Sequence, residues 1–233
     1  MTCGNSLNSV KSTLNLIALG LSCLCFFTVA GAQNVVDKTV ATVSDGVRTE
    51  LITYSDLKWQ LALQPGVTLT ELRTEDLNGA LALLVNQRIF ALEAERIPRP
   101  APTSLEIDAE IKRVLDRFPT TADFVRRLQA VGFESIRDDN FQRMIGKRVA
   151  IEKYIDFRFR SFIVNTPEEE TRYFNTVWAP EFRSKYQGLL MPTLDEKREE
   201  IDKLLTESKV VTNIEAFLDD AKRRVEIVIL KAV

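Results

Sequence analysis

The feature that most constrains the fold is a β-type segment, "VEIVIL" (Val225–Leu230), at the far end of the sequence. Its β-branched and apolar residues favour a strand, and a lone strand needs a partner for its backbone hydrogen-bonding groups. The other β-type residues are in "TVATVSDGVRTEL", two short runs around an Asp-Gly turn. We therefore expect Val225–Leu230 to pair with the Thr39–Leu51 hairpin in one small antiparallel sheet.

Between these strands the sequence predicts a series of helices. Apolar residues recur at helical spacing along 74–95, 103–118, 120–132, 139–162 and 193–224. Several segments begin with a threonine followed three residues later by an acid, a pattern in which the two residues cap each other's backbone N–H groups. Phe162 and Leu204 are expected to face inward, and Pro180 is expected to end the helix that Pro167 begins. The predicted fold class is mainly α, with many helices and one small sheet.

The first 32 residues have the pattern of a secretory signal peptide. Lys11 precedes an apolar run from Leu14 to Ala30, and alanines at positions 30 and 32 have the spacing that signal peptidase reads. We therefore expect cleavage before Gln33 and export of the remainder. An uncleaved membrane anchor is the alternative, because the run is close to the length that spans a bilayer.

Composition argues against several kinds of catalytic site. The chain has no histidine, and its three cysteines (Cys3, Cys23 and Cys25) lie in the expected signal peptide. Ser-His-Asp and Cys-His arrangements are therefore excluded, and a zinc site would lack its usual ligands. The carboxylates of Glu168–Glu170 are explained by their place at a helix start. A net charge of −2 gives no general attraction for nucleic acid.

Aromatic side chains offer another kind of surface, one that binds other polypeptides. The chain has 13 Phe, 4 Tyr and 2 Trp, and aromatics that stay uncovered give adaptable apolar contacts to an extended peptide. For any single aromatic residue, packing in the core is the favoured alternative. The candidate peptide-binding residues are Trp59, Phe90, Phe118, Phe124, Phe133, Phe141, Phe159, Trp178 and Tyr186.

The order of these elements resembles the chaperone module of SurA-like, parvulin-type periplasmic proteins. The similar features are "VATVSDGVRTELITYSDL", "LLVNQRIFALEAERI", "FRSFIVNTPEEETRYFN", and a long final helix that leads to a closing strand. The resemblance covers most of Val40–Leu230. In that family the "TPEE" segment leads into one or two prolyl-isomerase domains. Here the span from Pro180 to Pro192 is too short for a domain of at least about 50 residues.

This resemblance implies an ATP-independent holding chaperone of the periplasm, with no catalytic residue, cofactor or metal. The implied partners are unfolded exported proteins, above all outer-membrane proteins. They would bind in a groove between a core (33–97 and 163–233) and a helical arm (about 98–162) of a single domain at 33–233. An adaptor that binds one folded partner is an alternative, and so is an isomerase-family protein with residual or no activity. Whether two copies form a dimer is left open.

Overall fold

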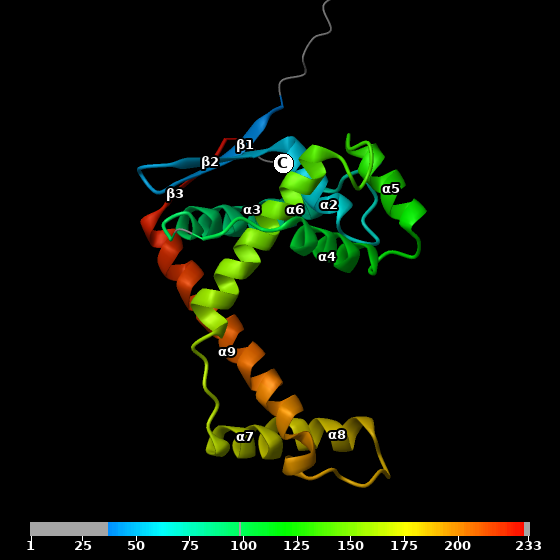
Figure 1. Cartoon of the computed structure of the whole chain (residues 1–233), viewed down its shortest axis with the longest axis vertical. Helices are drawn as coiled ribbons and strands as arrows, with labels where there is room; N and C mark the ends of the chain where they lie inside the picture. The colour runs from blue at the N-terminus through cyan, green and yellow to red at the C-terminus, as the bar shows by residue number, and fades with distance from the viewer. Residues whose placement is uncertain (1–36, 98, 231–233) are drawn as a thin grey trace, which may run out of the picture. The chain divides into compact units, whose positions relative to one another are not determined.

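The computed structural model describes residues 37–97 and 99–230, so the expected signal peptide at 1–32 lies outside the described residues. Within the described part, the chain is mainly helical, with one small antiparallel sheet (Figure 1). The predicted fold class, mainly α with a small sheet, is confirmed at this level.

The sheet joins the two ends of the described chain. Strands β1 (Thr39–Ser44), β2 (Thr49–Thr53) and β3 (Glu226–Ile229) are antiparallel in the order β2-β1-β3. Gly46 has a φ of 84° in the turn between β1 and β2, a conformation that glycine adopts without strain. In the central strand, Thr42 is paired with Leu51 on one side and with Val228 on the other. The predicted pairing of the last strand with the hairpin is therefore confirmed.

Four helices of the described part begin where the threonine-and-acid pairs predicted. At Thr53, Thr103, Thr166 and Thr193 the hydroxyl accepts from the backbone N–H three residues later, and the acid at that position accepts from the threonine N–H. The helices are α2 (Tyr54–Ala62), α3 (Thr74–Ala94), α4 (Ser104–Leu115), α5 (Thr121–Ala130), α6 (Asp139–Ile155), α7 (Pro167–Tyr173), α8 (Ala179–Lys185) and α9 (Leu194–Arg224).

The prediction that Pro180 ends a helix is wrong. Helical backbone continues from Pro167 to Lys185 through a wider π-type turn, η3 (Phe174–Trp178). Within it the Ala179 N–H donates to the Phe174 carbonyl five residues back. Pro180 follows directly after this turn, at the start of α8. The π-type turn therefore accommodates the proline without ending the helix.

Two residues expected to face inward do not. A second π-type turn, η2 (Asp156–Arg160), follows α6 and ends its helical register, so Phe162 lies beyond it with 73% of its surface exposed. Leu204 of α9 is 39% exposed, whereas Ile201 one turn earlier is fully buried. In both cases helical spacing identified the segment but placed one apolar residue on the wrong face.

Three hydrophobic clusters hold the described chain together. The first packs the sheet against α3 and the ends of α6 and α9, and the second packs α4, α5 and α6 against the end of α2. The third joins η3 and α8 to the first turns of α9. Tyr154 and Phe159, which lie within the expected arm, pack in the first cluster. The end of α6 therefore shares its core with the sheet and α3.

Candidate functional site

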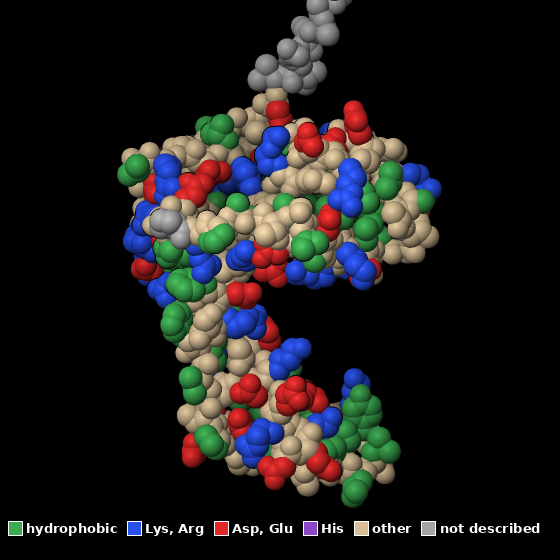
Figure 2. All heavy atoms as spheres, viewed as in Figure 1, with side chains coloured by type: hydrophobic (Ala, Val, Ile, Leu, Met, Phe, Trp, Pro, Cys, Tyr) green, Lys and Arg blue, Asp and Glu red, His purple; other side chains and the backbone are tan. Residues whose placement is uncertain are grey.

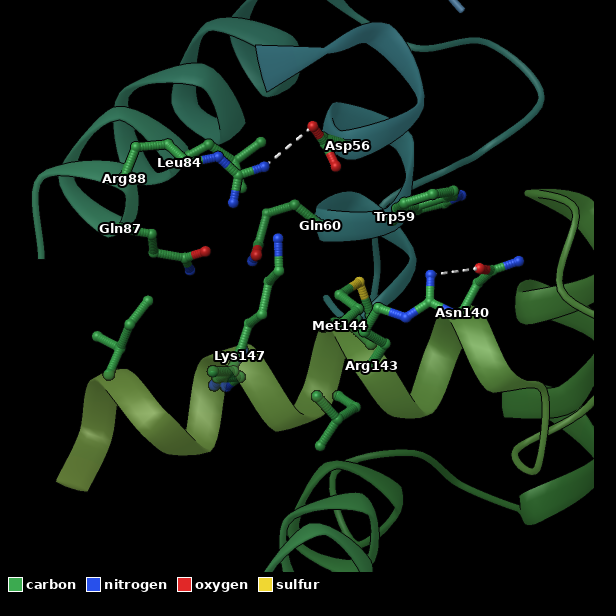
Figure 3. A pocket seen from close by; sticks show the side chains of 14 residues that line it. Asp56, Trp59, Gln60, Leu84, Gln87, Arg88, Asn140, Arg143, Met144 and Lys147 are labelled. Carbon is green, nitrogen blue, oxygen red and sulfur yellow. Dashed lines mark hydrogen bonds and ion pairs between the residues drawn. The ribbon is translucent and has the colours of Figure 1, made fainter. Parts of the chain in front are cut away.

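Two neighbouring cavities lie where α6 passes over α2 and α3. The first has a volume of about 190 Å³ and lies between α2, α3 and α6 (Figure 3). The second has a volume of about 660 Å³ and is lined by α3, α6 and the segment after α3. Arg88, Lys147 and Ile151 line both cavities. We call the two together the α3–α6 groove.

The inner wall of the first cavity is apolar. Leu63, Leu84 and Ile145 line it, each at most 5% exposed, because α2, α3 and α6 turn their buried faces toward one another there. Met144 and Trp59 lie at its side (Figure 3). The Trp59 indole N–H donates to the Val131 carbonyl over 3.1 Å, which fixes the ring in place. This cavity is smaller than a typical small-molecule site and suits a single side chain.

Ion pairs hold the frame of the groove. Arg88 of α3 donates to Asp56 of α2 over 3.1 Å and to the Leu51 carbonyl over 3.0 Å, so it ties both helices to the sheet (Figure 3). Arg148 of α6 lies 2.9 Å from the buried Glu110 of α4. These two arginines are neutralised by carboxylates and serve to position the helices.

Two cations at the first cavity have no carboxylate partner among the described residues. Lys147 forms no hydrogen bond or ion pair there, and Arg143 donates only to the side chain of Asn140, over 3.1 Å. Figure 3 shows the Lys147 side chain extending from α6 toward Gln60 of α2. The mouth of the first cavity therefore carries two positive charges that the described residues leave unneutralised.

The second cavity has small apolar side chains on facing helices. Ala91 and Ala94 of α3 lie opposite Ala150 and Ile151 of α6, with Ile97 nearby at 38% exposure. Because alanines project little, they leave space for this cavity between the two helices.

The segment that closes one side of this cavity is held by Arg99 and Glu106. The Arg99 guanidinium lies 4.0 Å from the centroid of the Phe157 ring and donates to the Lys153 carbonyl over 2.6 Å. A hydrogen bond from Lys153, supported by the Thr103 N–H and hydroxyl, lowers the pKa of Glu106 to about 2. Arg99 in the segment after α3 and Glu106 in the first turn of α4 are thus both tied to Lys153 of α6.

Most of the predicted aromatic residues pack inside the chain. Phe90 and Phe159 are in the first cluster, Trp178 is in the third, and none is more than 8% exposed. Trp59 is half-buried beside the groove, and Tyr186 is 41% exposed. The aromatics buried in the second cluster are Phe118, Phe124, Phe133 and Phe141.

A second apolar surface lies at the end of α8. The rings of Phe174, Trp178, Phe182 and Tyr186 stack in sequence, with centroids 5.0 to 5.5 Å apart. The chain then continues to Leu189 and Leu190, which are 65% and 94% exposed. Figure 2 shows hydrophobic side chains gathered there. We call Tyr186, Leu189 and Leu190 the α8 patch.

Sequence reasoning missed the residues that make the groove. Lys147 and Arg143 look like ordinary solvent-facing positions of an amphipathic helix, and no local pattern distinguishes them.

Among residues 37–97 and 99–230, no helix is long and apolar enough to cross a membrane, and no cluster of three or more candidate metal ligands occurs. Comparison with models of protein families and with curated proteins found no match to this chain.

Proposed function

We propose that this protein is an ATP-independent holding chaperone that binds unfolded segments of exported proteins. The observation that carries the proposal is the α3–α6 groove, which combines a cavity of about 660 Å³ with apolar side chains on two facing helices. An extended segment bound there would keep its apolar residues out of water. Binding the unfolded state holds it back from aggregation by mass action, with no chemistry and no cofactor.

The sequence resemblance supplies the rest of the proposal. From this resemblance we propose the periplasm as the protein's location and outer-membrane proteins as its clients. Their strands alternate apolar and polar residues, and the apolar ones stay exposed until the barrel closes. Seven of the nine candidate aromatics are buried. The proposed client-binding site is therefore the groove with Trp59, and Tyr186 of the α8 patch is proposed as a second contact with the client.

One observation favours the adaptor as a second candidate. The α8 patch exposes two neighbouring leucines, a feature typical of a surface that docks on one partner. An adaptor would bind a folded protein with fixed stoichiometry and show no preference for unfolded chains.

Dilution of a urea-unfolded outer-membrane β-barrel protein into buffer tests the proposal. We expect the protein, purified after export, to suppress light scattering at near-equimolar ratio without ATP, whereas an inert protein of similar charge does not. Unchanged scattering in the presence of the folded protein would reject the chaperone and leave the adaptor as the leading function. A proline-isomerisation assay on a short peptide, expected to show no activity, tests the isomerase alternative.

A further inference from the structure

The unneutralised cations at the first cavity point to the chemistry of the bound segment. Elsewhere on the described helices, arginines are commonly paired with carboxylates within 4.0 Å, as Arg113 is with Glu152 and Arg160 with Glu207. Lys147 and Arg143 are one helical turn apart on α6, both line the first cavity, and neither has such a pair in the described chain. Two positive side chains one helical turn apart repel each other slightly, so a bound anion would reduce this repulsion.

The wall behind these cations is apolar. Leu63, Leu84 and Ile145 are buried and line the cavity, and its volume of about 190 Å³ suits one side chain. A ligand that fits both the two cations and the apolar wall carries a carboxylate beside a large apolar side chain. The first cavity adjoins the second at Lys147 and Ile151, which line both, so the rest of an extended peptide would lie along the second cavity.

We infer that the first cavity is a subsite for a carboxylate next to an apolar residue of an extended polypeptide. The apolar side chain enters between Leu84 and Ile145, and the carboxylate lies between Lys147 and Arg143 at the mouth. The inference rests on the proposed function, since it names which segments the groove would prefer. The same chemistry is offered by a C-terminal carboxylate and by an internal aspartate or glutamate.

A set of dye-labelled peptides separates these sources. Each alternates threonine and phenylalanine, and one ends in a free carboxylate, one in an amide, and one in an amide with an aspartate beside an internal phenylalanine. Fluorescence anisotropy with the exported protein should show at least one carboxylate form binding about three- to tenfold more tightly than the plain amide. Preference for the free acid alone identifies chain ends, whereas preference for both carboxylate forms identifies any such acid.

Two variants and salt complete the test. The preference for the carboxylate peptides should disappear in Lys147→Glu and, separately, in the parent protein at 0.5 M salt. In the first case the charge is reversed and in the second it is screened, so it no longer attracts a carboxylate. Lys203→Glu, an exposed lysine of α9 outside the groove, is the matched control and should keep it. Equal binding of all three peptides, or an unchanged preference in Lys147→Glu, overturns the inference. If the protein still suppresses aggregation in that case, the proposed function survives; if it neither suppresses aggregation nor binds any peptide, both fail.

Discussion

Arg127 of α5 holds the second hydrophobic cluster to the end of α2. Its guanidinium donates to the carbonyls of Leu61, Ala62, Gln64 and Val67 over 2.8 to 3.1 Å. Leu61 and Ala62 are in the last turn of α2, where carbonyls lack partners within the helix, and the Leu61 carbonyl also accepts from the Gln64 N–H. Burial lowers the pKa of Arg127, but an arginine stays protonated at neutral pH.

Replacing Arg127 by methionine should therefore destabilise the fold. Methionine keeps an apolar stem of similar reach and removes all four hydrogen bonds. At a net value of about 1 kcal/mol each, the loss approaches 4 kcal/mol. Because the side chain is half-buried, water can replace part of this, and we expect a loss of about 2–3 kcal/mol.

Urea unfolding followed by tryptophan fluorescence measures this loss. Trp59 reports on the same region, since its indole lies 4.9 Å from the Phe133 ring in the second cluster. With a slope of about 2 kcal/mol per molar urea, the unfolding midpoint should fall by about 1–1.5 M. Arg126→Met, at the exposed neighbouring arginine paired with Asp123, should cost less than about 0.5 kcal/mol. Equal losses in the two variants would refute the role given to Arg127.

Further predictions concern the core, acid stability and the α8 patch. Phe124→Ala should cost about 3–5 kcal/mol in urea unfolding, because the ring is fully buried between aromatic neighbours. The lowered pKa of Glu106 means that its ion pair with Lys153 stabilises the fold at pH values above about 4.5. That contribution is lost as the pH falls toward about 2, and the loss should be smaller in Lys153→Gln. Leu189→Ser with Leu190→Ser should lower binding of an apolar dye and leave the free energy of unfolding within about 0.5 kcal/mol of the parent's; a large loss of stability would show that the patch is packed.

The parts of the fold that the sequence predicted depend on local chemistry. Thr103, Thr166 and Thr193 start helices because each hydroxyl and its acid satisfy nearby backbone groups, whatever the distant packing. The pairing of β3 with β1 was predictable because a lone strand needs a partner and few other segments could supply one. The prediction that Pro180 ends a helix was wrong because a π-type turn accommodates the proline, and such turns have no clear sequence signal.

The candidate site was less predictable, because it arises from how helices cross. For Phe124 and Phe141 the sequence favoured a core position over a peptide-binding surface, and their placement on α5 and α6 buries both. The unpaired state of Lys147 depends on which carboxylates the fold brings near, and these come from distant segments. A cavity formed by the small side chains of Ala91 and Ala150 has no local pattern at all.

Filling the groove tests the central claim most directly. Ala91→Trp places a large ring in the second cavity, whereas Ala82→Trp places it on an exposed position of the same helix outside both cavities. Both variants should keep the parent's helical circular dichroism. The account predicts that Ala91→Trp no longer suppresses aggregation of the unfolded β-barrel protein and that Ala82→Trp suppresses it as the parent does. A folded Ala91→Trp protein that holds the client as well as the parent would contradict the assignment of the groove as the client-binding site.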